Sequence, residues 1–228
     1  VLECTNDTDF ASQFDSHIKS RNESLGVLKF RPAELQPVTR SPEGFLDAIL
    51  QASLRMHARH AWDAPANKEG FDGKISFGLV RVANIKTAVA VARHLANNLP
   101  GVRVCCYHSQ AGVMQRWHIE RTLDRLLTRK GKDWAESCVK NESLAAAMSQ
   151  AANEGRSDLP LIVVATPVEE IGRDHDFDWG VIEPSSSQAL VQPGGRVNRH
   201  RLEIMTEPNI AILQFNYKTC CNVSGPVF

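Results

Sequence analysis

The sequence predicts an α/β protein built on an open parallel sheet with helices on both faces. A short apolar run rich in β-branched residues at 161–165 is typical of a strand buried on both faces, and we expect further strands at 75–82 and 102–107. They alternate with stretches whose apolar residues have the helical period. This alternation implies right-handed crossovers, and therefore a parallel sheet that is covered on both sides.

The first 73 residues are polar and interrupted, and we expect them to form a mainly helical extension, residues 1–73, ahead of a domain at 74–228. Residues 25–30 have the composition of a short strand. Pro42 begins a predicted helix that runs to about residue 62, with apolar side chains spaced for one buried face.

From residue 75 the predicted elements follow one another regularly. Asn84 is placed to cap the helix that follows the strand at 75–82, and Pro100 follows the end of that helix. In chain order we expect a strand at 75–82, a helix to residue 98, a strand at 102–107, a helix at about 113–129, strands at 161–165 and 178–184, a helix from about 186, and a last strand at 210–215.

Residues 130–158 interrupt this order. They are polar except for an alanine-rich stretch near 144–152, which has the pattern of a helix. We therefore expect this segment to be a surface insertion.

The charge balance restricts the classes of function. The chain has 26 basic and 26 acidic residues, so it lacks the strong positive charge of a free-standing, high-affinity DNA-binding module. Backbone amides, hydroxyls and helix N-termini can still hold a phosphate backbone. The six cysteines form no Cys-x-x-Cys pair and no apolar run could span a membrane, so we expect a cytoplasmic protein with no membrane partner.

Two arginines stand three residues apart in the segment Gln-Pro-Gly-Gly-Arg-Val-Asn-Arg, residues 192–199. On a helix this spacing would point Arg196 and Arg199 in one direction, where their guanidinium groups suit the charge on a transferring phosphoryl group. Gln192 lies one turn earlier, although Pro193 and two following glycines disfavour an unbroken helix. The alternative is a solvated basic helix end, where arginines interact favourably with the helix dipole.

A second motif follows the apolar run at 161–165. Thr166 comes directly after it, and Gly172-Arg173-Asp174 begins six residues later. Open α/β sheets bind their ligands outside the carboxyl ends of the strands, so this motif has the position of a binding loop.

Together the two motifs resemble motifs V and VI of superfamily 2 helicases, in the second of their two RecA-like domains. The longer sequences around these motifs are similar to the helicase–nuclease of type I CRISPR systems, most like subtype I-F. They are Gly-Arg-Asp-His-Asp-Phe-Asp-Trp at 172–179 and Gly-Arg-Val-Asn-Arg-His-Arg at 195–201. The resemblance covers about residues 74–215 and implies a RecA-like fold. It also implies ATP-driven movement along single-stranded DNA, coupled to nuclease degradation of foreign DNA.

The resemblance implies roles in nucleotide chemistry for five residues. Arg196 and Arg199, with Gln192, would act on the γ-phosphate of ATP across a cleft between two RecA-like domains. Gly172 and Asp174 would line the nucleotide.

A second group would hold the backbone of single-stranded DNA. It comprises Thr166, Arg81, Asn84 and His108, which follow or end predicted strands. From the residues alone, an ordinary helix cap explains Asn84 equally well, and a structural role explains His108.

The chain contains no Gly-x-x-x-x-Gly-Lys-Ser/Thr loop to hold phosphates and Mg²⁺. We therefore expect half of an ATPase, inactive by itself, with ATP and Mg²⁺ bound mainly by a first RecA-like domain. The resemblance implies further partners: a His-Asp nuclease domain of the same protein, an RNA-guided surveillance complex, and CRISPR integrase or phage inhibitor proteins. The alternatives are another superfamily 2 helicase, acting in repair or on RNA, and a non-catalytic docking module of the same fold.

The run of aspartates at 174–178 does not fit a metal site. A calcium loop needs Gly at its sixth position and Glu at its twelfth, where the chain has Trp179 and Ser185. A metal-dependent His-Asp phosphohydrolase needs a second His/Asp set, which is not evident. We expect no metal ligand in this chain.

Overall fold

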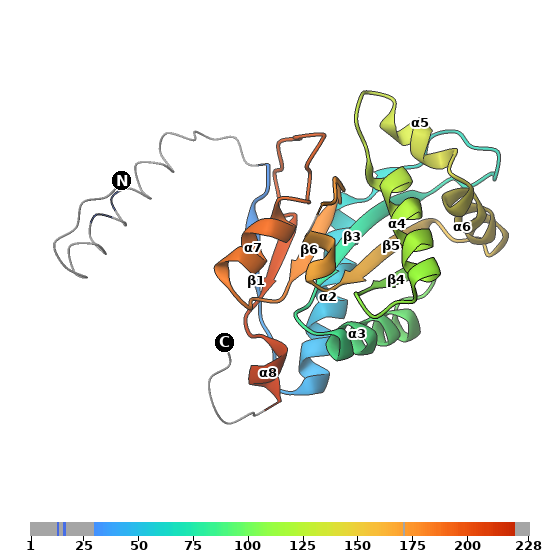
Figure 1. The fold of residues 1–228 in the computed structure, drawn as a ribbon. Helices are drawn as coiled ribbons and strands as arrows, with labels where there is room; N and C mark the ends of the chain where they lie inside the picture. The colour runs from blue at the N-terminus through green and yellow to red at the C-terminus, as the bar shows by residue number, and fades with distance from the viewer. Residues whose placement is uncertain (1–12, 14–15, 17–29, 171, 222–228) are drawn as a thin grey trace.

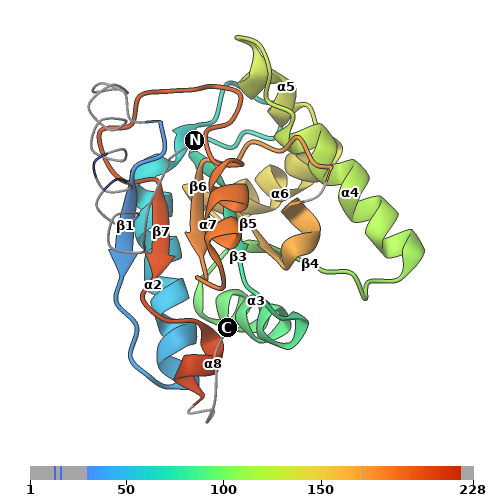
Figure 2. The ribbon, with the colours of Figure 1, turned by 60° about the vertical axis from the view of Figure 1, so that its left-hand side comes forward.

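The computed structural model of the chain describes residues 13, 16, 30–170 and 172–221. Figures 1 and 2 show a twisted open sheet with helices on both of its faces. Its strand order is β1-β7-β6-β3-β5-β4, all parallel, and β2 pairs antiparallel with β3. The strands are β1 (Ala33–Gln36), β2 (Trp62–Asp63), β3 (Lys74–Arg81), β4 (Arg103–Tyr107), β5 (Asp158–Ala165), β6 (Trp179–Ile182) and β7 (Ile210–Leu213).

Helices α2 and α3 cover one face of the sheet, while α4, α6 and α7 cover the other. The central strands β3 and β5 are buried along most of their length because helices lie on both sides of them, which confirms the expected parallel sheet. The helices are α2 (Pro42–His60), α3 (Ile85–Asn98), α4 (Val113–Leu127), α5 (Trp134–Val139), α6 (Glu142–Asn153), α7 (Ser187–Gly194) and α8 (Tyr217–Cys220), with a 3₁₀ helix η1 (Pro167–Glu170).

The segment before residue 73 contributes to this sheet. Strand β1 pairs in parallel with β7, and α2 buries Phe45, Ile49 and Met56 against the sheet. Most of the strand expected at 25–30 lies outside the described residues. Where the domain begins stays a prediction, although β1 pairs with β7 and α2 packs against the sheet.

The expectation that residues 130–158 form a surface insertion is wrong. Helix α6 buries Leu144, Met148 and Ala151 in the core that it shares with α4. The polar residues of the segment lie on the outer side of α5 and α6, so its average composition hides the buried face.

The carboxyl ends of three strands lie in one row. Ala165 at the end of β5 is opposite Arg81 of β3 on one side and Tyr107 of β4 on the other. The loops that follow these strands therefore meet at one edge of the sheet, where the sequence predicts the binding residues.

Candidate functional site

The loops after β3, β4 and β5 border a groove of about 860 Å³. We call it the strand-end groove. It is lined by Ala83, Asn84, Ile85, Lys86, Thr87, Ser109, Gln110, Thr166, Pro167, Val168, Tyr217 and Lys218. The structure thus brings together Asn84 and Thr166, which the sequence analysis had selected from separate loops.

Asn84 occupies the N-cap position of α3, but its side chain makes no capping hydrogen bond. At the start of α2, by contrast, the Ser41 hydroxyl accepts a hydrogen bond from the amide of Gly44 at 2.9 Å. The ordinary capping role therefore does not account for the Asn84 amide, which is available to a ligand.

Thr166 is the first residue after β5 and is 5% exposed. Its backbone amide donates to the carbonyl of Tyr107 at 3.2 Å, which extends the pairing between β5 and β4 by one residue. Its carbonyl accepts from the amide of Glu169 and so begins η1. Backbone hydrogen bonds on both sides thus hold Thr166 at the base of the strand-end groove.

Glu183 was not selected from the sequence, yet it shapes this groove. Its buried carboxylate accepts hydrogen bonds from the amides of Ala83, at 2.6 Å, and Tyr217, at 2.8 Å. It therefore ties the loop after β3 to the start of α8. Its position directly after β6, among residues that follow the other strands, is the signal that could have identified it.

Arg81 and His108 do not line the strand-end groove. Arg81 is buried and donates to the hydroxyl of Ser185 at 2.8 Å. His108 is half-buried and precedes Ser109 and Gln110, which do line the groove. The predicted DNA contacts of these two residues stay predictions.

The two motif arginines do not lie on one helix. Helix α7 ends at Gly194, and a backbone pairing follows in which the amide of Phe177 donates to the carbonyl of Arg196 and the amide of Asn198 donates to the carbonyl of Phe177, both at 2.8 Å. The expected shared helical face is therefore wrong. Arg196 is 7% exposed, whereas 41% of the Arg199 side chain is exposed.

Asp174 and Arg199, both predicted to act on the same nucleotide, form an ion pair at 2.8 Å. Asp174 also accepts from Lys130 Nζ at 2.6 Å and from His200 Nε2 at 2.9 Å. Hydrogen bonds from these cationic partners, of which that from Lys130 has the largest effect, hold the pKa of Asp174 well below its usual range.

Gly172 and Gln192 complete the predicted nucleotide set. Gly172 has φ +66°, and no atom lies within 4 Å of where a Cβ would be, so it gives the chain a left-handed turn beside open space. Gln192 lies on the exposed side of α7, before the helix ends at Gly194. We call the segment that follows, residues 195–201, the arginine loop. The structure thus brings Asp174 to Arg199 but leaves Gln192 on a different element from both arginines.

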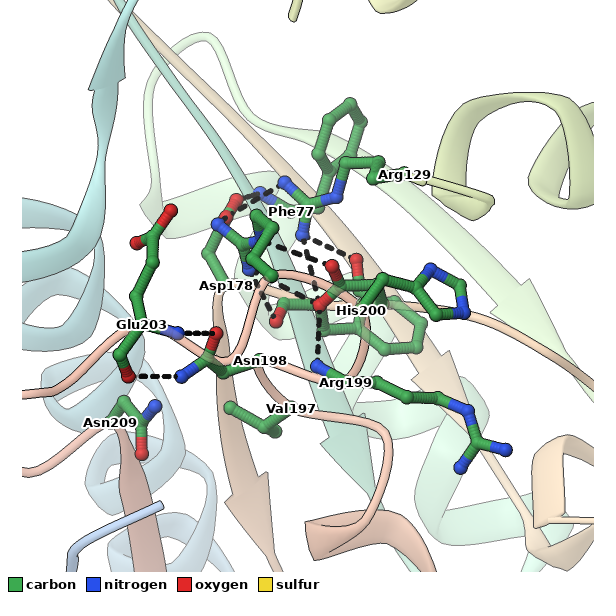
Figure 3. A network of polar contacts seen from close by, with 12 residues as sticks. Phe77, Arg129, Asp178, Val197, Asn198, Arg199, His200, Glu203 and Asn209 are labelled. Atoms are coloured by element: carbon green, nitrogen blue, oxygen red, sulfur yellow. Dashed lines mark hydrogen bonds and ion pairs between the residues drawn. The ribbon is translucent and has the colours of Figure 1, made fainter. Parts of the chain in front are cut away.

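A buried group of charges anchors the arginine loop (Figure 3). We call Arg129, Asp176, Asp178 and Arg201 the charge cluster. Asp178 accepts from Arg129 at 2.8 Å and from Arg201 at 2.7 Å, and Arg201 also donates to Asp176 at 3.0 Å. Burial alone would raise the pKa of Asp178, but the two guanidinium groups outweigh it and lower that pKa.

The charge cluster also fixes the backbone next to Arg199. The amide of Arg199 donates to Asp176 Oδ1 at 2.9 Å, while Figure 3 shows the side chain of Arg199 directed away from the cluster. Arg129 and Arg201 are not among the residues predicted from the sequence. The alternate spacing of three aspartates at 174–178 is typical of an extended segment whose carboxylates share one side, and this pattern could have indicated that cationic partners face them.

Within the described residues, no group of three or more His, Cys, Asp and Glu side chains has the arrangement of a metal site. None of the described helices is long and apolar enough to cross a membrane.

Comparison with known proteins identifies relatives of this chain. Residues 74–202 match the family described as CRISPR-associated nuclease/helicase Cas3, C-terminal. The chain is 34% identical over 222 residues to the CRISPR-associated nuclease/helicase Cas3 subtype I-F/YPEST of Pectobacterium atrosepticum, covering 92% of the chain and 20% of the relative. It is 41% identical over 150 residues to the protein of the same description from Pseudomonas aeruginosa, covering 64% of the chain and 14% of the relative.

Two of the solved structures that match are those of T. fusca Cas3 with AMPPNP and with ADP. Their TM-scores are 0.54 and 0.52, both at 18% identity, and they cover 83% and 87% of this chain and 19% of each matched chain. This similarity confirms the α/β fold class. The chain spans about a fifth or less of the length of the curated relatives and solved structures that it matches.

Proposed function

The chain belongs to the Cas3 family of CRISPR-associated nuclease/helicases, in its C-terminal region, and on this premise we propose that it is the second RecA-like half of an ATP-dependent DNA helicase. In this proposal the strand-end groove holds single-stranded DNA and the arginine loop acts on ATP. The whole protein would couple movement along DNA to nuclease degradation of foreign DNA.

The strand-end groove supports the part of the proposal that concerns DNA, and it is the observation that carries the proposal. Asn84 and Thr166 offer an amide and a hydroxyl from two loops on the same groove. Neutral donors of this kind position a phosphate backbone without reading its sequence. They also agree with a chain whose charges balance, because such a groove needs few cations.

The pair of Asp174 and Arg199 supports the part that concerns ATP. A half-exposed guanidinium that already binds a carboxylate can bind a phosphate oxygen with the same geometry. We propose that Arg199 exchanges Asp174 for the γ-phosphate, that Arg196 assists from its buried position, and that Gln192 contributes a polar contact. Gly172 and Asp174 would then border the nucleotide.

ATP with Mg²⁺, bound mainly by a first RecA-like domain, would supply the free energy for movement. The residues of this chain orient the γ-phosphate and hold the DNA, so we expect the chain alone to bind ATP weakly and to hydrolyse none above background. The partners that we propose are the first RecA-like domain, a His-Asp nuclease domain of the same protein and an RNA-guided surveillance complex. CRISPR integrase and phage inhibitor proteins are further proposed partners.

Substitution of Arg199 tests the proposal. In the whole protein, Arg199→Ala should lower DNA-stimulated ATP turnover by about 10³–10⁵, the effect of removing an arginine finger. The melting temperature should change little because the side chain is half-exposed. Arg93→Ala, at an exposed arginine of α3, is the matched control and should retain wild-type turnover. Wild-type turnover in Arg199→Ala would refute the assignment.

A further inference from the structure

The outer face of α4 carries a row of side chains that the proposed function does not use. Trp117, Arg121 and Arg125 are exposed and stand four residues apart, so they lie one above another along the helix. Lys140, just after α5, joins them in a groove of about 530 Å³, which we call the α4 groove. The remaining lining residues are His118, Thr122, Ser137, Asn141, Glu142 and Ser143.

Among the described residues, the cations of the α4 groove have no carboxylate partner. No ion pair joins Arg121, Arg125 or Lys140 to any of the described residues, although Arg116 of the same helix pairs with Glu120. Glu142 is the one carboxylate among the residues that line this groove in the described part of the chain. The surface therefore has an excess of positive charge that a polyanion can neutralise.

Trp117 gives this surface an aromatic ring as well. Trp117 is 52% exposed, and the guanidinium carbon of Arg121 lies 5.0 Å from the centroid of its ring. Exposed aromatic rings beside arginines are the usual means of holding unpaired bases, since every base can stack on them. The row of unpaired cations beside an exposed ring matches the combination of charge and stacking that holds a single strand.

The α4 groove and the strand-end groove are lined by neighbouring segments of the chain. Gln110 lines the strand-end groove, and α4 begins three residues later at Val113. From Val113 to Arg125 the helix rises about 18 Å, enough for several nucleotides of a single strand. A strand held in both grooves would run along α4 between them.

We propose that the α4 groove is a second binding site for single-stranded DNA, in which Trp117 stacks on a base and Arg121, Arg125 and Lys140 neutralise phosphates. The proposal rests on the proposed function, because it extends the DNA path beyond the strand-end groove. It assigns to this surface the charge-dependent part of DNA binding, and to Asn84 and Thr166 the part that is independent of charge.

The salt dependence of DNA binding tests this assignment. For the whole protein and a labelled oligothymidine, the slope of log K against log salt concentration should become shallower by about 1.4 in Arg121→Gln/Arg125→Gln, since each lost contact to a single strand removes about 0.7. The exposed Arg93 of α3 provides the matched control, and Arg93→Gln should keep the wild-type slope. Both arginines are exposed and form no ion pair with any described residue, so the melting temperature of the double variant should stay close to that of wild type.

Two further variants separate stacking from charge. Trp117→Ala should weaken binding about tenfold, within the range measured for the loss of one stacked base, and should leave the salt slope unchanged. Trp117→Phe should recover most of the lost affinity. Equal affinities for wild type and Trp117→Ala would contradict the stacking.

Thr166→Val distinguishes failure of this inference from failure of the proposed function. If Thr166→Val weakens binding while the double arginine variant keeps the wild-type slope, the α4 groove does not bind DNA and the strand-end groove does. This result would overturn the inference, and the α4 groove would then be a candidate surface for contacts with another protein. If the double variant has the shallower slope and Thr166→Val binds DNA as wild type does, the α4 groove binds DNA. The proposed DNA contact of Thr166 is then refuted.

Discussion

The strand-end groove and the charge cluster use polar groups in opposite ways. In the charge cluster, Asp178 and Arg201 are buried and bound to each other, and both also bind further partners. In the strand-end groove, the Asn84 side chain makes no capping bond, and Thr166 sits at the base of an open groove. Polar groups that are satisfied within the protein fix the loops, and those that are not are available to a ligand.

The pair of Asp174 and Arg199 is intermediate between these two regions. Each side chain is nearly half-exposed, so solvent screens the attraction and the pair contributes little to stability. Their neighbours in the chain, Asp176 and Arg201, are buried and hold the backbone in place. A weak pair on a rigid support is suited to exchanging its carboxylate for a phosphate.

The largest stability effect that we expect is in the charge cluster. Arg201→Ala should lower the free energy of unfolding by about 3–5 kcal/mol, because it leaves two buried carboxylates without one of their cations. Urea denaturation with an unchanged m value measures this loss. Arg199→Ala is the matched control, with an expected loss below about 1 kcal/mol. Similar losses in both variants would remove the distinction between buried and exchangeable arginines.

The pH dependence of stability tests the same cluster. The lowered pKa of Asp178 means that its contribution is present above the unfolded value of about 3.9 and is lost as the pH falls through the folded value. Asp178→Asn should therefore be less stable than wild type by about 3 kcal/mol near pH 7, with a difference that shrinks below about pH 4. A difference that stays constant down to acid unfolding would show that the Asp178 charge is not what stabilises the fold.

A smaller effect is expected at the base of the strand-end groove. Thr166→Val should weaken binding of single-stranded DNA about 2- to 10-fold, the effect of one lost neutral hydrogen bond. The salt slope should not change because a hydroxyl releases no counterion. Affinity titrations over a range of salt concentrations measure both quantities. Unchanged DNA affinity together with weaker ATP binding would move Thr166 to the nucleotide site.

The smallest effect separates two residues at helix N-caps. Ser41→Ala should destabilise the protein by about 1 kcal/mol, because it removes the capping bond to Gly44. Asn84→Ala should cost a few tenths of a kcal/mol, since its side chain caps nothing, but it should weaken DNA binding. If Asn84→Ala lost as much stability as Ser41→Ala while DNA affinity stayed constant, Asn84 would be an ordinary cap.

The sequence predicted the central elements because their signals are local. Residues 161–165 of β5 form a continuous apolar run, and most side chains of β3 are apolar or small, so both segments indicate buried strands without reference to distant contacts. Thr166 and Asn84 come together because both follow parallel strands, whose carboxyl ends must share an edge. These parts of the candidate site needed no knowledge of long-range contacts.

Elements at the edge of the sheet were not predicted because their signals depend on neighbours. Strand β1 has the sequence Ala-Glu-Leu-Gln, and its Leu35 is exposed, so it contains no apolar run. Its pairing with β7, far along the chain, is what makes it a strand. A glycine in the central strand β3 depends on a neighbouring strand as well. A Cβ at Gly78 would lie 2.1 Å from the ring of Trp179 on the adjacent strand β6, so only glycine fits there.

By itself, the sequence determined the parallel sheet, the family resemblance, and the residues from which the two motifs are built. The tertiary structure alone decided which charges are buried. The spacing of Arg196 and Arg199 indicated one helical face, but backbone pairing with Phe177 turns this segment away from α7 and separates the two side chains in exposure. Arg129 joins the charge cluster from a distant part of the chain. The physical reason is that helix and strand patterns follow from neighbours in sequence, whereas the burial of a charge depends on opposite charges that folding brings from elsewhere.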